Sequence, residues 1–403
     1  MSIIIDNIKQ YAIFIALVII AVIFHFLTGG VLFRPANVSN LIVQNGYIMV
    51  LAIGMTLVIV TGRIDLSVGG IMGLAGALSG AFIATIGIPA EVAFILVLAA
   101  GFVIGVFQGY LIAYKNMPFF VVTLAGMMMY RGLTMVFLGG RMIGPFPSRF
   151  QAMATGFVPD FLGGLFGQLD FNITTGVVCG TLALIIIIIE LNKRKTSRKY
   201  GVDSLPMPLF IIKILLIVGL IGLFGYWLGN ANGIPVVLVL LGILFVVYSF
   251  ITNKTIVGRH IYATGGNAKT SELSGVKTKQ IVFWVYVNMA MLAALAGMIF
   301  VARLNLANPR VGVGDELQAI AAAFIGGASP SGGVGKVSGA IAGAMLIGIL
   351  DNAMNHIGWS LDARLVVIGL VLLAAVIFDV LMKNRATRRS KNIEIVEEVE
   401  TEA

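Results

Sequence analysis

Long apolar runs separated by short polar loops fill most of the sequence. Each run is about 20 residues long, which is the length of a helix that crosses the hydrocarbon core of a membrane. The two-residue alternation of a half-buried strand is missing from these runs. The pattern predicts membrane-spanning helices at 11–33, 41–61, 66–86, 91–113, 119–138, 171–190, 209–229, 233–252, 281–302, 336–355 and 360–382.

A shorter apolar run covers residues 317–328. It is too brief to span a thick bilayer alone, but it is long enough to cross where protein surrounds it. The distribution of basic residues favours a crossing, because cytoplasmic loops of membrane proteins are enriched in Lys and Arg. Three basic clusters guide this interpretation: Lys193, Arg194, Lys195, Arg198 and Lys199; Lys254, Arg259, Lys269, Lys277 and Lys279; and Lys383, Arg385, Arg388, Arg389 and Lys391.

All three clusters lie on one side of the membrane only if the short run crosses. The prediction is therefore an all-α, polytopic membrane protein of about 12 crossings, one of them short, with both termini in the cytoplasm. We expect one transmembrane domain over residues 1–403, with a cytoplasmic loop at 253–280 and a charged cytoplasmic tail at 384–403.

Composition agrees with a membrane protein. Hydrophobic residues make up 59% of the chain and charged residues 11%, and the mean hydropathy is +1.02, which is outside the range of soluble domains. The net charge of +9 does not indicate a nucleic-acid partner, because the basic residues lie in short loops and not on one face. The single cysteine, Cys179, lies in an apolar run and is expected to pack there.

No pattern of catalytic or metal-binding residues emerges from the sequence. His25, His260 and His356 fall on different predicted elements and lack partners at ligand spacing, so we expect no metal site, no cofactor and no enzyme. Residues 333–337 resemble part of a phosphate-binding loop. However, Pro330 and Val337 occupy the places of the required Gly and Ser or Thr, so the chain lacks a nucleotide site of its own.

Glycine is abundant and patterned. Two rows with glycine at every fourth position, 101–109 and 335–343, predict close helix packing, either within the chain or at a subunit interface. Two glycine-rich hairpins, 62–70 and 326–335, each precede a helix rich in Gly and Ala. Such breaks line cavities in transporters, and a simple tight turn is the alternative. The residues of interest are Asp65, Ser67, Gly69, Gly326, Gly327, Gly332 and Gly333.

Asp65 has a second interpretation. It stands just before the predicted helix at 66–86, where an acidic side chain favours the positive end of the helix dipole. Arg63 is a candidate to neutralise it.

The loop at 253–280 is too elaborate for a mere connector. Asn267 suits an N-cap, residues 268–274 make about two turns of helix, and Gly275 suits a left-handed C-terminal position, with Gly266 a further candidate for such a backbone. The stretch 269–272 is polar and leaves little apolar face for lipid, which favours a protein partner for this surface helix.

These motifs together resemble the permeases of bacterial monosaccharide ABC importers of the ribose, xylose and galactose type. The resemblance covers nearly the whole chain and is strongest at 64–69, at 265–267 with 274–275, and at 319–322 leading into the second hairpin. Ribose-type members resemble ten-span proteins. The additional stretch at about 170–230, with its basic loop at 191–208, is similar to the xylose and multiple-sugar branch, whereas Arg63 departs from the family pattern.

The resemblance implies a monosaccharide pathway formed by two permease copies in the bacterial cell membrane. A cytoplasmic ATPase subunit would dock on the loop helix, and an extracytoplasmic sugar-binding protein would deliver the substrate. The residues expected to couple to the ATPase are Gly265, Gly266, Asn267, Glu272, Leu273, Ser274 and Gly275.

Polar residues inside predicted spans are candidates to line the pathway, namely Asn45, Thr123, Asn288, Asp351 and Asn352. Hydrogen bonds between neighbouring helices are the alternative for each. A proton-coupled secondary sugar transporter is the rival function, and a lipid-modifying membrane enzyme is a third. The rival commonly needs carboxylates inside the membrane, and Asp351 is the only acid that the sequence places well inside an apolar run.

Overall fold

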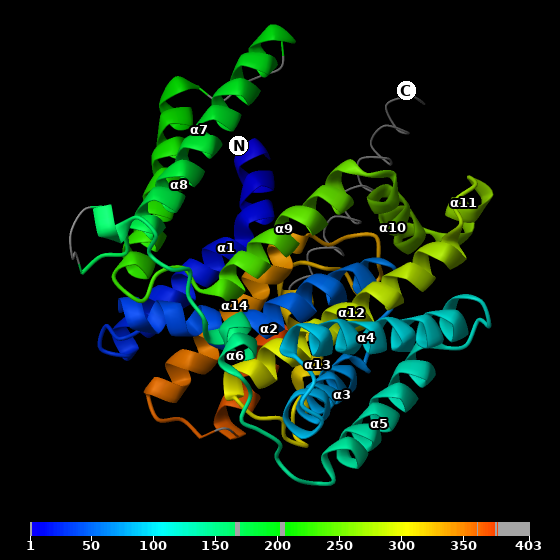
Figure 1. The fold of residues 1–403 in the computed structure, drawn as a ribbon. Helices are drawn as coiled ribbons and strands as arrows, with labels where there is room; N and C mark the ends of the chain where they lie inside the picture. The colour runs from blue at the N-terminus through cyan, green and yellow to red at the C-terminus, as the bar shows by residue number, and fades with distance from the viewer. Residues whose placement is uncertain (1, 166–169, 202–205, 361, 375–376, 378–403) are drawn as a thin grey trace, which may run out of the picture.

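A computed structural model describes residues 2–165, 170–201, 206–360, 362–374 and 377. Within these residues the fold is helical, and the only β-type contacts are two isolated bridges, Ile143 with Ala307 and Phe157 with Pro235 (Figure 1). The helices are α1 (Ser2–Leu27), α2 (Pro35–Val60), α3 (Val68–Ser79) with its π-helical continuation η1 (Gly80–Thr85), α4 (Ala90–Ala113), α5 (Phe119–Leu138), α6 (Ser148–Thr155), the short 3-10 turn η2 (Gly163–Leu165), α7 (Ile173–Lys199), α8 (Met207–Gly229), α9 (Val236–Lys254), α10 (Ile256–Gly266), α11 (Ala268–Leu273), α12 (Thr278–Leu304), α13 (Asp315–Ile325) and α14 (Val337–His356).

The polytopic helical class predicted from the sequence is confirmed. Nine helices of the described chain are long and apolar enough to cross a membrane, and residues 15–27 of α1 add a shorter apolar stretch. Each predicted run coincides with a helix where the structure describes it. The last run, 360–382, is described as helix for 362–374, and the predicted tail at 384–403 lies outside the described residues.

The centre of the molecule is formed by α2 and α12, which are buried along most of their length. The glycine row of α4 lies against α12, as expected for close packing within the chain. A Cβ on Gly105 would lie 2.6 Å from the Cα of Val287, and one on Gly101 would lie 2.7 Å from the Cβ of Ala294. Dispersion and close backbone contact hold such helices together, because apolar side chains gain nothing by leaving lipid for protein.

The second row packs α14 on α13. A Cβ on Gly343 would lie 2.1 Å from the carbonyl oxygen of Ala322, and one on Gly339 would lie 2.0 Å from that of Gly326. Both glycine rows therefore serve contacts within one chain.

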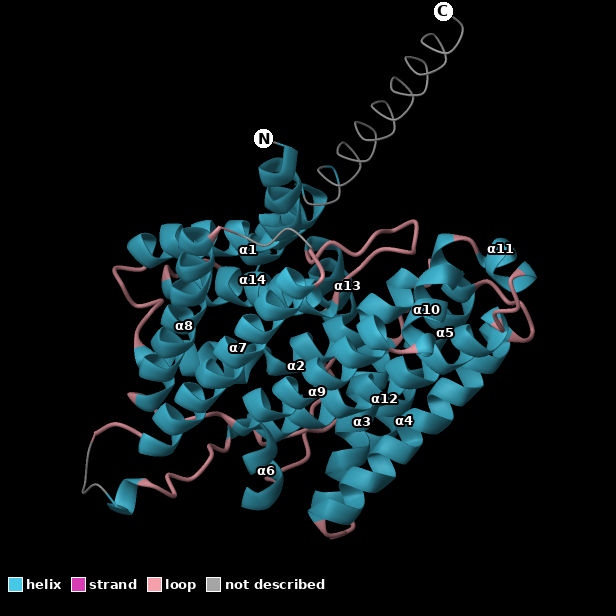
Figure 2. Ribbon diagram, turned by 90° about the horizontal axis from the view of Figure 1, so that it is seen from above, coloured by secondary structure: helices cyan, strands magenta, loops and turns pink. Residues whose placement is uncertain are grey.

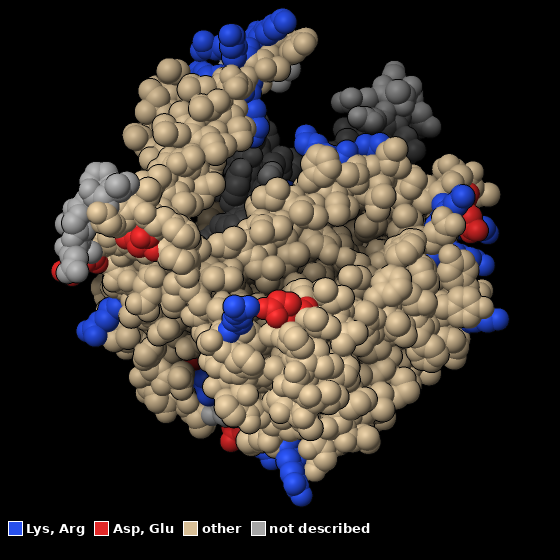
Figure 3. Space-filling view, viewed as in Figure 1, with Lys and Arg blue, Asp and Glu red and all other residues tan. Residues whose placement is uncertain are grey.

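The pair α7 and α8 stands at one side of the molecule, opposite α4 and α5 (Figures 1 and 2). These two helices pack mainly on each other and leave most of their side chains exposed. They correspond to the additional stretch at about 170–230. Lys and Arg gather at the tip of α7 and around α10 and α11, and most of the surface between is uncharged (Figure 3).

The short run forms α13, which begins at Asp315 and is 11 residues long. At 1.5 Å per residue it extends about 16 Å, roughly half of a bilayer core. The non-helical residues 305–314 lie along α3 and extend the path. Ala307 lies beside Gly80 and Gly312 beside Gly69, at opposite ends of that helix. Val311 and Gly312 of this segment are buried, whereas Arg310 and Val313 are exposed, so protein covers only part of this irregular backbone.

The packing of α4 on α12 generates a stability prediction. Gly105→Ala should destabilise the protein by about 1–3 kcal/mol, since its Cβ would press on backbone that cannot yield. The control is Gly219→Ala on α8, where no atom lies within 4 Å of the new Cβ. There the better helix propensity of Ala should leave stability equal or slightly higher. Thermal unfolding in detergent measures both, and equal melting temperatures for the two variants would contradict this packing.

Candidate coupling surface and buried polar sites

The loop at 253–280 folds into two short helices. The predicted N-cap is confirmed, since Asn267 Oδ1 accepts a hydrogen bond from the backbone N–H of Thr270 at 3.0 Å and α11 follows. Gly275 has a φ of +86°, the expected left-handed conformation. The sequence did not predict α10, which Thr255 caps by accepting a hydrogen bond from the Gly258 N–H at 3.2 Å.

The surface of α11 is open. Asn267, Glu272, Ser274 and most of the helix are exposed, and Ser271 is its buried residue. The side chain of Leu273 is 82% exposed. An apolar side chain presented among charges on a short helix is typical of a contact with a protein partner and not with lipid.

The end of α10 meets both glycine-rich hairpins. We call this contact, made by Gly62, Gly265, Gly332 and Gly333, the glycine junction. A Cβ on Gly332 would lie 2.6 Å from the Gly265 carbonyl oxygen and 2.9 Å from the Gly62 nitrogen. The N–H of Gly333 donates to the carbonyl of Val60, the last residue of α2, at 2.8 Å. Three motifs that are distant in the sequence therefore meet at one place.

Each glycine of the junction has a specific reason. Gly62, Gly332 and Gly333 have φ values of +75°, +80° and +73°, which other residues adopt only with strain. Gly265 is needed for space, since a Cβ there would lie 1.6 Å from the Val60 carbonyl oxygen. The expectation of a left-handed backbone at Gly266 was wrong, because this residue ends α10 in open space without a positive φ.

The remaining hairpin residues have structural partners. Gly326 lies against Gly339 of α14, and Gly327 takes a φ of +87° after α13. Asp65 is fully buried, and its Oδ1 accepts hydrogen bonds from the N–H and the hydroxyl of Ser67 at 2.8 and 2.6 Å. These bonds fit the interpretation of Asp65 as an acid that fixes the turn into α3. Arg63 does not neutralise it, since its guanidinium donates to the Thr61 carbonyl at 2.8 Å.

Each pathway candidate has a hydrogen-bond partner within the chain, and Asn45 lies against Gly348 of α14, the helix that carries Asp351 and Asn352. The Asn45 amide donates to the Leu41 carbonyl, Thr123 to the Phe120 carbonyl, Tyr248 to Asn288, Arg364 to Asp351, and the amides of Asn352 and Asn37 bond each other. Such contacts are expected if these polar residues link or stabilise helices and do not line a pathway. A pathway role for these five residues stays a prediction.

Two carboxylates that the sequence analysis missed lie deep in the molecule. Glu316 pairs with Arg131 of α5, with 2.7 Å between Oε1 and the guanidinium nitrogen. Asp315 accepts a hydrogen bond from the Tyr47 hydroxyl at 3.3 Å. Asp315 and Glu316 are both buried, whereas the side chain of Asp351 is 47% exposed.

Asp351 remains the only acid well inside a predicted apolar run, but it is not the only acid in the interior, since Asp315 and Glu316 are buried. Asp315 and Glu316 precede the short run, so the hydropathy pattern assigned them to a loop. The signal that could have found them was the pair of acids at the start of an apolar helix.

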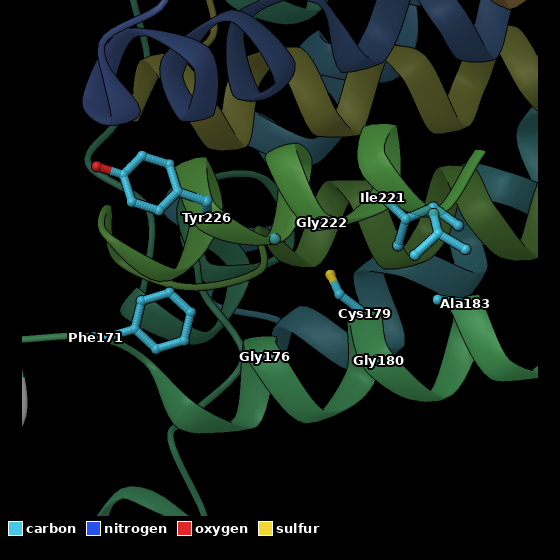
Figure 4. A pocket seen from close by; sticks show the side chains of 10 residues that line it. Phe171, Gly176, Cys179, Gly180, Ala183, Ile221, Gly222 and Tyr226 are labelled. Atoms are coloured by element: carbon cyan, nitrogen blue, oxygen red, sulfur yellow. The ribbon is translucent and has the colours of Figure 1, made fainter. Parts of the chain in front are cut away.

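A separate cavity of about 320 Å³ lies between α7 and α8. Figure 4 shows Cys179 directed toward Gly222 between the two helices, with Phe171 and Tyr226 at one end. Most of the lining is apolar, and the cavity contains no charged group that would orient a ligand. Nowhere in the described residues do three or more His, Cys, Asp or Glu side chains form a group that could hold a metal ion.

Comparison with known proteins relates the chain to transport proteins along most of its length. Residues 37–376 match the family described as branched-chain amino acid transport system / permease component. The xylose transport system permease protein XylH of Haemophilus influenzae is 33% identical over 384 residues, covering 94% of this chain and 98% of that protein. The ribose import permease protein RbsC of Escherichia coli K12 is 33% identical over 347 residues, covering 86% of each chain. No solved structure matches.

The glycine junction generates a second stability prediction. Gly265→Ala should lower the free energy of unfolding by about 1–3 kcal/mol, because the Val60 carbonyl must move to admit the methyl group. Gly266→Ala, one residue away in open space, is the matched control and should be neutral. Thermal unfolding and limited proteolysis of the 253–280 loop report the change. Unaltered unfolding and cleavage in Gly265→Ala would rule out this contact.

Proposed function

The chain belongs to the branched-chain amino acid transport system permease family, and we propose that it is the membrane-spanning subunit of an ATP-binding-cassette importer that carries a monosaccharide into the cell. Its relatives named as xylose and ribose permeases align over most of the chain, which supports a sugar substrate. The alignment covers 98% of the xylose permease of H. influenzae, so xylose or a related sugar is the first substrate to test.

ATP hydrolysis belongs to a separate subunit. The chain lacks a phosphate-binding loop, and its permease family supports this division of labour. Two further partners are proposed, a second copy of the permease and an extracytoplasmic sugar-binding protein. The family relation favours this assembly over a proton-coupled secondary transporter, and dependence of uptake on the ATPase subunit distinguishes the two.

The coupling element is α11 with the end of α10. The observation that carries this assignment is the combination of an open α11 with the glycine junction. A groove in the ATPase subunit would receive the exposed Leu273, while the end of α10 lies directly on backbone of α2 and of the 326–335 hairpin. Movement of the ATPase would then reach the membrane helices through backbone contacts instead of flexible side chains.

Docking can be tested on a residue that the isolated chain does not need. Leu273→Ala should leave the stability of the permease unchanged, because the side chain is 82% exposed. It should cost about 2 kcal/mol of docking energy if the leucine fills a groove. Gly275→Val should weaken coupling by straining the left-handed turn, at about 1–3 kcal/mol locally.

The measurements are ATP hydrolysis stimulated by the loaded binding protein and sugar uptake in proteoliposomes. Leu220→Ala on α8, also an exposed leucine, is the control and should behave as the parent. The coupling assignment fails if both loop variants insert correctly and keep parental hydrolysis and uptake.

The proposed orientation places both termini and the loops at 191–208 and 253–280 in the cytoplasm, because basic residues concentrate there. With Cys179 replaced by Ala, cysteines at Thr196 and Ser274 should resist a membrane-impermeant thiol reagent in intact cells and react in inverted vesicles. Met142, 71% exposed after α5, should show the opposite result when replaced by Cys. Labelling of Ser274→Cys from outside would reverse the orientation.

A further inference from the structure

The last turns of α4 lie against the beginning of α12, the helix that follows α11 in the chain. A Cβ on Gly109 of α4 would lie 2.8 Å from the carbonyl oxygen of Phe283 of α12. The opposite side of α4 is open, and the helix lies at the side of the molecule away from α7 and α8 (Figure 2). This end of α4 is therefore fixed to α12 on one face and exposed to the surroundings on the other.

The exposed face of α4 changes character toward its end. Val103 and Phe107 are exposed there, and Tyr110 and Tyr114 follow them. Residues three or four positions apart share one face of a helix, so these four side chains form a single strip. The strip passes from purely apolar side chains to phenols, which is the order expected where a helix leaves the hydrocarbon core and enters the headgroup layer of a membrane.

Aromatic side chains of α12 continue this layer. The ring centroids of Tyr114 and Phe283 lie 5.7 Å apart, and those of Phe283 and Trp284 lie 5.2 Å apart. The side chain of Trp284 is 57% exposed. It lies about 9 Å along the helix from Thr278, the first residue of α12. Tyrosine and tryptophan accumulate at the boundary between membrane and water, so these rings mark the depth of that boundary.

Lysines lie on the water side of these rings. Lys115 is exposed, and its Nζ lies 5.6 Å from the centroid of the Tyr110 ring. Lys279 is also exposed and precedes Phe283 by one helical turn. A groove of about 230 Å³ begins here and is lined by Glu272, Lys277, Thr278, Lys279 and Gln280. Together, Lys115 and the groove contribute three lysines and one acid, so the local charge is positive.

We propose that this end of α4 and α12 binds the headgroup of an anionic phospholipid in the cytoplasmic leaflet. The acyl chains lie along the exposed strip of α4 and beside Trp284, and the phosphate lies beside Lys115 and Lys279. Ammonium groups donate hydrogen bonds to phosphate oxygens, and a lysine near an anionic surface strengthens binding by up to about fivefold, less at high salt. The orientation proposed above assigns the leaflet, whereas the preference for an anionic headgroup depends neither on orientation nor on transport.

Two other roles for this region lead to different results. An aromatic belt alone fixes the depth of the helices in a bilayer of any headgroup, without a preference for anionic lipid. Lysines that contact only the ATPase subunit also leave the isolated permease without such a preference. A lipid preference measured on the permease alone therefore distinguishes a lipid site from both.

The experiment uses the full-length permease with Trp284 as its single tryptophan, obtained by Trp227→Phe and Trp359→Phe. The protein is placed in lipid nanodiscs that contain phosphatidylglycerol and phosphatidylcholine, and one of the two lipids carries brominated acyl chains. Bromine quenches the fluorescence of a nearby indole. Quenching across a series of lipid mixtures gives the binding constant of phosphatidylglycerol relative to phosphatidylcholine beside Trp284.

Lys115→Gln and Lys279→Gln, singly and together, are the test variants. Both side chains are exposed, so their replacement should not disturb the fold. Lys195→Gln is the matched control, because it removes the same charge from an exposed position near the end of α7, on the opposite side of the molecule.

Phosphatidylglycerol should bind the parent about tenfold more strongly than phosphatidylcholine, and each single test variant should lower this ratio about threefold. The double variant should bring the ratio close to one, and the control should keep the parental ratio. Equal binding of the two lipids by the parent would overturn the lipid site, as would a parental ratio in the double variant. An equal loss in Lys195→Gln would also overturn it, because the preference would then arise from the net charge of the whole protein.

Discussion

Close approach of one backbone to another is the constraint on which this structure depends. Between helices in a membrane there is no hydrophobic gain to drive association, so contact must come from shape and from polar groups. Glycine allows two backbones to approach closely at three places: α4 meets α12 at Gly105, α14 meets α13 at Gly343, and α10 meets the end of α2 at Gly265. Side chains at these positions would separate the helices that form the core.

The same constraint decides where the chain can leave helical geometry. Residues 62–67 and 305–314 have backbone N–H and C=O groups that lipid cannot satisfy, and other parts of the chain cover both segments in part. Each of these segments contains or leads to buried acidic residues: Asp65 precedes α3, while Asp315 and Glu316 begin α13. The carboxylates are thus a consequence of the broken elements, because a continuous helix would present its N-terminal acids at the membrane surface.

The hydropathy pattern was sufficient for the helical spans, since about 20 apolar residues have few other solutions in a chain of this composition. Local rules were sufficient for the Asn267 cap and the Gly275 turn, which depend on neighbours within a few residues. Contacts between distant segments were beyond such rules. Gly265 and Gly266 look alike in the sequence, and only the position of the Val60 carbonyl distinguishes them. Glu316 precedes the short apolar run, and its partner Arg131 lies 185 positions away, so no local rule relates the two residues.

The geometry also connects the proposed docking surface for the ATPase with the interior of the molecule. The 326–335 hairpin contacts α10 at the glycine junction, and it continues directly from α13. α13 is a single helix of 11 residues, whose last turn leads into the junction and whose first turn carries Asp315 and Glu316. A helix of about 16 Å moves as one body, because its backbone hydrogen bonds resist bending over so short a length. A displacement of the hairpin at the glycine junction would therefore move the Glu316 carboxylate relative to Arg131 on α5, and the proposed docking surface is connected to this buried ion pair through one short helix.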